Sequence, residues 1–308
     1  MNIMTLINAL PGAVAQGLIW GIMAIGVYLT FRILDFADLT VDGSMCTGGA
    51  VCIMMMQAGF GVWPSMLAAT GAGMLTGLAT GIFHTCMGIP AILSGILTQL
   101  SLYSVNLKIM GKANQAISVG KYDLLVSLRY IKGVPFYQNT IFVVAVFILV
   151  LIAVLYWFFG TELGCAIRAT GCNSSMSRAQ GINTSFNKVL VLMVSNGLVA
   201  LSSALLAQYQ GFADVNMGRG AIVIGLAAVI IGEAVFSKIF RNFALRLLGV
   251  ALGSILYYLV LQTVIWLGID TDLLKLLSAI VVAIFLATPY WKGKYFSKPM
   301  KRGGNSNA

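Results

Sequence analysis

Long apolar runs, separated by shorter polar stretches, make up most of the chain. Residues 141–159 form an unbroken apolar stretch without the alternation expected of a barrel strand. Several runs approach the ~20 residues that a helix needs to cross the hydrocarbon of a bilayer. The candidate spans are residues 11–31, 44–57, 63–86, 90–110, 140–159, 189–207, 221–236, 243–267 and 273–289. The pattern predicts an all-α polytopic membrane protein with eight or nine transmembrane helices in a single domain covering residues 1–308.

Two of these runs, residues 44–57 and 221–236, are too short to cross alone at ~1.5 Å per residue. Each follows a polar, glycine-containing stretch, DFADLTVDG before the first and GFADVNMGRG before the second. An offset of 176 positions aligns Phe36-Ala37-Asp38 with Phe212-Ala213-Asp214. A faint internal repeat with an interrupted short helix in each half is typical of a transporter core. We expect repeat halves of about 11–110 and 189–289.

Composition and charge support the membrane assignment and suggest an orientation. Only 9% of residues are charged, against ~25% in soluble domains. The net charge is +10, and the basic tail over residues 290–308 places the C-terminus in the cytoplasm by the positive-inside rule. The central polar segment (residues 160–188) then lies inside, whereas residues 111–139 lie outside despite four basic residues there. The excess positive charge indicates contact with anionic lipid headgroups rather than nucleic acid.

The two possible span counts differ in the side of the N-terminus. With nine spans the N-terminus lies outside and the repeats are inverted. If residues 44–57 form a re-entrant half-helix, eight spans and an internal N-terminus follow. We favour nine.

The chain carries no hydrolytic, redox or nucleotide-binding motif. No phosphate-binding loop, zinc-protease motif or metal-type cysteine spacing occurs, and the five cysteines read as packing residues. We therefore expect no catalytic residue, no metal and no cofactor in this chain, and we do not expect an enzyme.

Polar residues within the interrupted stretches are candidates for a translocation path, because charged groups near a membrane centre usually face protein or water. The candidates are Asp38, Asp42, Gly43, Asn216, Gly220 and Glu233. The alternative is that Arg32 pairs with the nearby aspartates at an aqueous interface, and that Asp42 and Asn216 only cap helices.

The central polar segment contains the pattern Gly164-x-x-x-Arg168-Ala169 … Asn173 … Ala179-x-Gly181-Ile182-Asn183. We expect it to form one or two short helices. With the residues from Phe36 to Thr40 and from Gly220 to Gly232, this pattern resembles the permease subunits of the branched-chain amino-acid and ribose family of ABC importers. The resemblance covers residues 11 to 290. The stretch 38–44 is most similar to the branch for tryptophan, tyrosine and related amino acids.

The resemblance implies an assembly in the bacterial inner membrane. A second copy of the permease would complete the translocation path as a homodimer, and two cytoplasmic ATP-binding subunits would bind ATP and Mg²⁺. An extracytoplasmic substrate-binding protein would deliver a small polar solute, with an amino acid, including an aromatic one, favoured. The residues implied to couple to the ATPase are Gly164, Arg168, Ala169, Asn173, Arg178, Ala179 and Gly181.

Two alternatives remain open. An ion-coupled secondary transporter would need acidic or histidine sites in the membrane and would not need the central polar segment. A permease of the same family could instead carry a sugar or a nucleoside.

Overall fold

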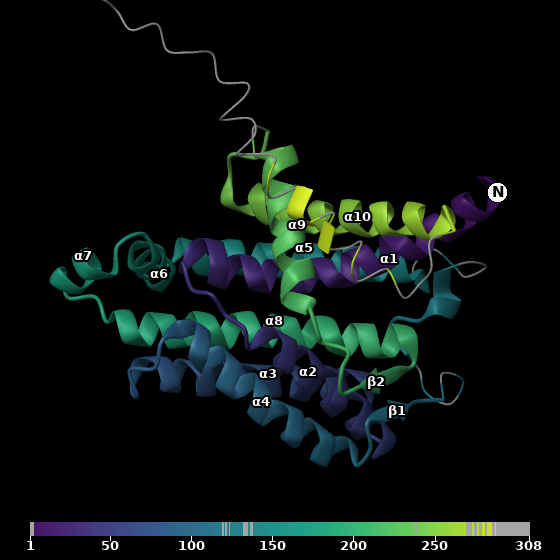
Figure 1. The fold of residues 1–308 in the computed structure, drawn as a ribbon, viewed down its shortest axis with the longest axis horizontal. Helices are drawn as coiled ribbons and strands as arrows, with labels where there is room; N and C mark the ends of the chain where they lie inside the picture. The colour runs from purple at the N-terminus through teal and green to yellow at the C-terminus, as the bar shows by residue number, and fades with distance from the viewer. Residues whose placement is uncertain are drawn as a thin grey trace, which may run out of the picture.

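Helices form nearly all of the secondary structure that the computed structural model describes (Figure 1). The description covers residues 3–268, except 119, 121, 123, 132–134, 136–137 and 238, together with 273, 276, 279–280, 282–284 and 287. The first half contains α1 (Ile3–Tyr28), the π-helix η1 (Leu29–Ile33), α2 (Val41–Gln57), α3 (Val62–Thr85), α4 (Ala91–Met110), β1 (Asn114–Ala116) and the 3₁₀ helix η2 (Leu128–Ile131). The second contains α5 (Thr140–Gly160), α6 (Glu162–Cys172), α7 (Ser174–Ala179), α8 (Thr184–Gln210), β2 (Phe212–Asp214), α9 (Ala221–Phe236) and α10 (Phe243–Trp266).

Five helices in the described part of the chain are long and apolar enough to cross a membrane. They are Met4–Ile33, Val62–Thr85, Thr140–Gly160, Thr184–Gln210 and Phe243–Trp266. Five such helices confirm the prediction of a multi-pass membrane protein. The count of eight or nine crossings stays a prediction. The ninth predicted span, residues 273–289, lies largely outside the described residues.

Burial separates central helices from peripheral ones. The apolar window of α1 is 83% buried within the chain, whereas that of α5, the most hydrophobic helix, is only 28% buried. Since hydrocarbon is as apolar as the side chains of α5, this helix needs no protein cover to remain in a bilayer. We therefore take α1 as part of the core and α5 as lipid-facing over much of its surface.

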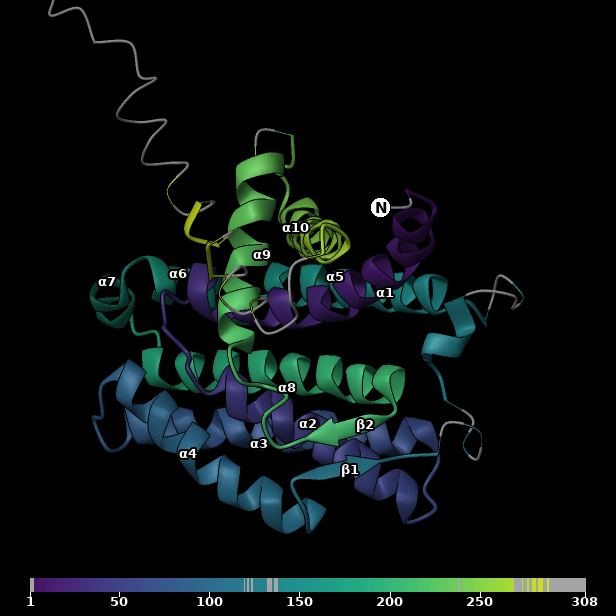
Figure 2. The same ribbon diagram turned by 45° about the vertical axis from the view of Figure 1, so that its right-hand side comes forward.

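The two halves are arranged around α1 and α8, which run antiparallel at the centre of the molecule (Figures 1 and 2). Helix α3 packs along α8, and α10 packs along α1. Helix α2 also contacts α8, and α9 contacts α1. In each half, then, a long first helix (α1 or α8) is followed by a short helix (α2 or α9) and a long one (α3 or α10), and the last two pack against the first helix of the other half. The two first helices run in opposite directions.

Glycines allow the long helices to approach closely. A Cβ atom added at Gly77 of α3 would lie within 2.6 Å of the Leu192 carbonyl carbon on α8. One added at Gly17 of α1 would lie 2.8 Å from the Ile255 Cα on α10. Small residues at such crossings bring backbones into van der Waals contact, which drives helix association where hydrophobic burial cannot.

The extended stretches before α2 and α9 repeat one local turn. The Asp38 carboxylate Oδ1 accepts a hydrogen bond of 2.9 Å from the Thr40 backbone N–H. The Asp214 Oδ1 accepts one of 2.6 Å from the Asn216 N–H. Both pairs are separated by the same 176 positions that align the two sequences. The stretches therefore share hydrogen-bonding geometry as well as residue types.

A small two-stranded antiparallel sheet lies at the end of the molecule opposite α6 and α7 (Figure 1). Strand β1 pairs with β2 in the register Asn114↔Asp214. The sheet ties the connection after α4 to the start of the second interrupted stretch.

Candidate functional site

Asp42 joins the two interrupted helices. It lies in the first turn of α2, but its carboxylate accepts hydrogen bonds of 3.0 Å each from the backbone N–H groups of Gly220 and Ile222. These groups belong to the N-terminus of α9, which has no cap from a neighbouring side chain. A carboxylate there satisfies orphan donors and complements the helix dipole. Asp42 thus caps a helix 178 residues away in sequence rather than its own.

Gly220 has the backbone geometry that this contact requires. Its φ is +84°, in the left-handed region that glycine adopts without strain. Asn216 is not the helix cap suggested by its residue type, because α9 begins only after Gly220. Asn216 is exposed, and its backbone N–H belongs to the turn made by Asp214.

A cavity of about 250 Å³ opens beside Asp42. Its walls come from the start of α2, one face of α4 and the turn before α9. The lining residues are Asp42, Gly43, Cys46, Gln99, Leu100, Tyr103, Asn106, Val215 and Arg219. Gly43 is buried against α4, where an added Cβ would lie 2.8 Å from a Leu102 methyl carbon. The cavity therefore contains two of the predicted path residues, Asp42 and Gly43.

Asp38 faces the protein interior instead. Asp38 is only 2% exposed, and its Oδ2 accepts a 2.7 Å hydrogen bond from the Asn196 amide of α8. Ser44 donates to the Asn196 Oδ1 at 2.6 Å and lies 2.7 Å from the Thr76 hydroxyl of α3. This network joins α2, α3 and α8 through buried polar groups that are all satisfied, which favours a structural role for Asp38.

Glu233 lies away from the Asp42 cavity. It is 12 positions beyond Ala221 on α9, about 18 Å along the helix axis at 1.5 Å per residue. Its carboxylate pairs with Arg32 at 3.0 Å, the one salt bridge among the described residues. The alternative interpretation, in which Arg32 pairs with the neighbouring aspartates, is therefore wrong: Arg32 at the end of η1 reaches α9 instead.

The central polar segment folds into two short helices, as predicted, because side chains cap each helix start. The Thr161 hydroxyl accepts from the Gly164 N–H, and the Asn173 Oδ1 accepts from the Met176 N–H. Asn183 caps α8 in the same way. Helices α6 and α7 lie at one end of the molecule, between the ends of α5 and α8 (Figure 1).

The residues implied to couple to an ATPase have two kinds of environment. Gly164 is buried, with α6 packed directly on Phe158 and Phe159 of α5. The others are exposed: Arg168, Ala169, Asn173, Arg178, Ala179 and Gly181. Gly164 therefore fixes α6 to its own chain, and the exposed residues form a surface available to a partner.

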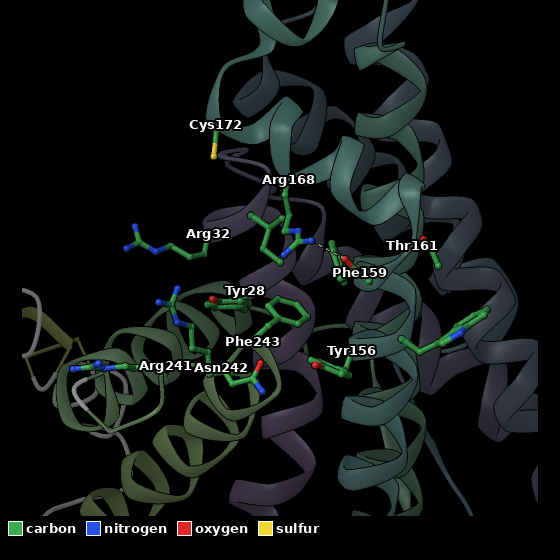
Figure 3. Close-up of a pocket in the computed structure, with 14 residues that line it drawn as sticks. Tyr28, Arg32, Tyr156, Phe159, Thr161, Arg168, Cys172, Arg241, Asn242 and Phe243 are labelled. Atoms are coloured by element: carbon green, nitrogen blue, oxygen red, sulfur yellow. Dashed lines mark hydrogen bonds between the residues drawn. The ribbon is translucent and has the colours of Figure 1, made fainter. Parts of the chain in front are cut away.

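Arg168 links α6 to the end of α5 (Figure 3). Its Nη2 donates to the Phe159 carbonyl at 3.0 Å, satisfying a carbonyl in the last turn of α5. Arg168 borders a cavity of about 850 Å³ between the ends of α1, α5 and α10. Arg32, Arg241 and Arg246 also line it, so this end of the molecule is strongly basic.

Known proteins match nearly the whole chain. The family model described as the permease component of branched-chain amino acid transport systems covers residues 10–286. The chain belongs to this family. The permease is therefore a membrane transport component and not an enzyme. No solved structure matches the chain.

Relatives of the permease carry different solutes according to their names. A tyrosine transport system permease protein of Clostridioides difficile (strain R20291) is 38% identical over 281 residues, 91% of each chain. The fructose import permease protein FruF of Bifidobacterium longum (strain NCC 2705) is 27% identical over 86% of this chain and 73% of its own. The autoinducer 2 import system permease protein LsrC of Yersinia pestis (strain Pestoides F) is 28% identical over 68% of this chain and 58% of its own.

Several polar residues of the permease escaped the sequence analysis. Asn196 holds Asp38, and the residues that line the Asp42 cavity include Gln99, Tyr103 and Asn106. A signal was present, since Gln99 and Asn106 are amide side chains within an apolar run. Their spacing of seven places them on one face of α4, the face that lines the cavity.

Proposed function

We propose that the chain is the membrane-spanning subunit of an ATP-driven importer for a small polar solute, with an amino acid as the favoured class and an aromatic amino acid as the first candidate. The name and 38% identity of the tyrosine transport relative support this substrate class. Two copies of the chain would enclose the path, two cytoplasmic ATP-binding subunits would supply the energy, and an extracytoplasmic receptor would deliver the solute. ATP and Mg²⁺ would bind to the partner ATPase.

The observation that carries the proposal is the form of the central polar segment. The two capped helices α6 and α7 connect the end of α5 to the start of α8, and they expose apolar and basic side chains on the same surface. Leu163 is 48% exposed and Met176 is 63% exposed, beside the exposed Arg178. Such a mixed surface suits docking to a soluble protein, since exposed apolar groups favour burial at an interface. In this proposal the segment and the C-terminus are cytoplasmic.

Contacts within the chain connect the exposed surface of α6 and α7 to the long helices α5 and α8. Gly164 seats α6 on α5, and Arg168 bonds to the Phe159 carbonyl. The Asn187 amide of α8 donates to the Thr170 hydroxyl of α6 at 3.0 Å. Movement of α6 by an ATPase would therefore act on both α5 and the central helix α8, as in a rigid-body switch between two states.

Reconstitution tests the proposal directly. Proteoliposomes would contain the permease with its co-purified ATPase, with ATP and Mg²⁺ inside and the co-purified receptor and labelled L-tyrosine outside. We expect accumulation that depends on ATP and on the receptor. The permease alone should accumulate nothing under a sodium or proton gradient. Gradient-driven uptake by the permease alone would contradict the proposal, and accumulation of fructose in place of any amino acid would reject the substrate class.

The substitution Arg168→Glu tests the role of the central polar segment. It places a carboxylate near the Phe159 carbonyl, which repels it, so the hydrogen bond that links α6 to the end of α5 is lost. We expect ATP hydrolysis by the complex to continue while uptake falls at least tenfold. Arg129→Glu, on an exposed site in η2, is the matched control and should leave both rates unchanged. Equal uptake by the two variants would argue against the coupling role.

A further inference from the structure

The cavity beside Asp42 has the size of a small solute. Its volume of about 250 Å³ corresponds to roughly eight water molecules at ~30 Å³ each. It lies below the ~300–1,000 Å³ range of sites for drug-sized ligands. The cavity lies where α2 and α9 both begin. It is bounded by the start of α2, by α4, and by the turn that precedes α9.

Asn106 forms part of the wall of this cavity. The residue is 1% exposed, and its Nδ2 donates to the Gly43 carbonyl at 3.4 Å. That bond fixes the amide orientation, because a carbonyl can only accept. The Oδ1 has no hydrogen-bond partner among the described residues. The Asn106 side chain also lies within hydrogen-bonding reach of the Cys46 thiol, but this thiol is a weak donor and is directed to the Asp214 carbonyl at 3.6 Å. An ammonium group is a stronger donor for the Oδ1.

Charges of both signs lie on the cavity wall. The Asp42 carboxylate uses one lone pair on each oxygen to cap α9, which leaves others free, since a carboxylate offers about four acceptor sites. The exposed guanidinium of Arg219 has no ion pair among the described residues. The cavity wall therefore carries one negative and one positive side chain.

From this arrangement we propose that the cavity binds a zwitterionic α-amino acid during its passage. The ammonium group donates to Asp42 and to the Asn106 Oδ1, and the carboxylate accepts from Arg219. Leu100, Tyr103 and Val215 surround an apolar or aromatic side chain. A sugar would leave both Asp42 and Arg219 without a charged partner, and a solute with a net charge would leave one of the two without a partner. An unpaired charge is costly in a partly buried site. The proposal rests on the proposed function and specifies where the substrate class is recognised.

Ligand analogues test each charged contact separately. The probes are L-tyrosine and L-tyrosinamide, which lacks the carboxylate but retains the ammonium group. Binding to the permease–ATPase complex without receptor is measured by saturation-transfer difference NMR, which detects weak ligands. We expect Arg219→Gln to weaken L-tyrosine binding about tenfold or more and to leave L-tyrosinamide binding unchanged. Arg129→Gln is the control and should change neither.

Asn106→Leu supplies an independent variant on the ammonium side. It should weaken L-tyrosine and L-tyrosinamide equally, because both carry the ammonium group. N-acetyl-L-tyrosine, whose amine is blocked, should bind poorly to the unsubstituted complex. If Arg219→Gln weakened both probes equally, Arg219 would have a structural role and the assignment would be overturned.

A failure of this site can be distinguished from a failure of the proposed function. The complete transporter with its receptor is first tested for uptake of each of the twenty L-amino acids, and the one that accumulates, with its amide, replaces the tyrosine probes if it differs. If none accumulates, the substrate class is wrong and the site with it. If one accumulates but Arg219→Gln does not separate it from its amide, only the site is wrong.

Discussion

The cap that Asp42 provides to α9 predicts a specific effect of Asp42→Asn. The carboxylate accepts from two backbone N–H groups, of Gly220 and Ile222. An asparagine amide has one acceptor oxygen and would direct its NH₂ group at one of these donors. The start of α9 would then hold an unpaired donor and lose the favourable charge at its N-terminus.

The magnitude follows from the cost of that donor. An unsatisfied buried donor costs about 1–3 kcal/mol. Because Gly220 is exposed and Ile222 is only partly buried, the cost at the first turn of α9 lies near ~1 kcal/mol, and local opening becomes about 5-fold more frequent at ~1.36 kcal/mol per factor of ten. Hydrogen exchange of the permease in lipid nanodiscs, read by mass spectrometry, measures this frequency. Peptides covering residues 218–226 should exchange faster by this factor, while peptides from α5 should not change.

The chain offers a matched control in the same segment. Asp35 is exposed and has no side-chain hydrogen bond among the described residues. Its φ is +54°, a conformation that asparagine tolerates, so Asp35→Asn makes the same chemical change without strain. Intact protection of residues 218–226 in Asp42→Asn, or an equal loss of protection in Asp35→Asn, would show that Asp42 does not stabilise the start of α9.

Two further predictions concern packing and surface charge. Gly77→Ala should destabilise the α3–α8 crossing by about 1–3 kcal/mol and lower the thermal midpoint in detergent, because its Cβ meets the backbone of α8. Gly71→Ala on the same helix meets nothing within 4 Å and should leave the midpoint level or slightly higher, so equal shifts would contradict this account. For the Arg32–Glu233 pair, with side chains 61% and 36% exposed, a double-mutant cycle with Arg32→Gln and Glu233→Gln should give a coupling energy of at most about 1 kcal/mol. A clearly larger value would mean that the pair is more shielded from solvent than its exposure indicates.

The long helices were predictable because their signal is local. The apolar run 140–159 became α5, Thr140–Gly160, since a helix that satisfies its own backbone is the simplest solution in hydrocarbon. Helix α8 extends beyond its predicted run, 189–207, to Thr184–Gln210, because Asn183 caps it ahead of the apolar stretch. The ends of helices depend on such caps as well as on hydropathy.

The candidate site was predictable in its residue types but not in its contacts. Asp42 was identified as a helix cap or a path residue, and it is a cap, yet for α9 rather than α2. Asp38 and Asp42 are four positions apart and equally acidic, but Asp38 is enclosed by Asn196 and Asp42 borders a cavity. Nothing in their local sequence distinguishes them.

The sequence by itself determined that this chain is a helical membrane protein, where its long spans lie, and that a polar segment with capped short helices interrupts them. Each of these properties depends on neighbouring residues, through apolar length and capping side chains. Only the tertiary structure decided that Asp42 meets α9 and that Asn106 and Arg219 share its cavity. Those contacts join residues more than 60 positions apart, and they form because glycine-lined helices pack close enough to bring the two halves together.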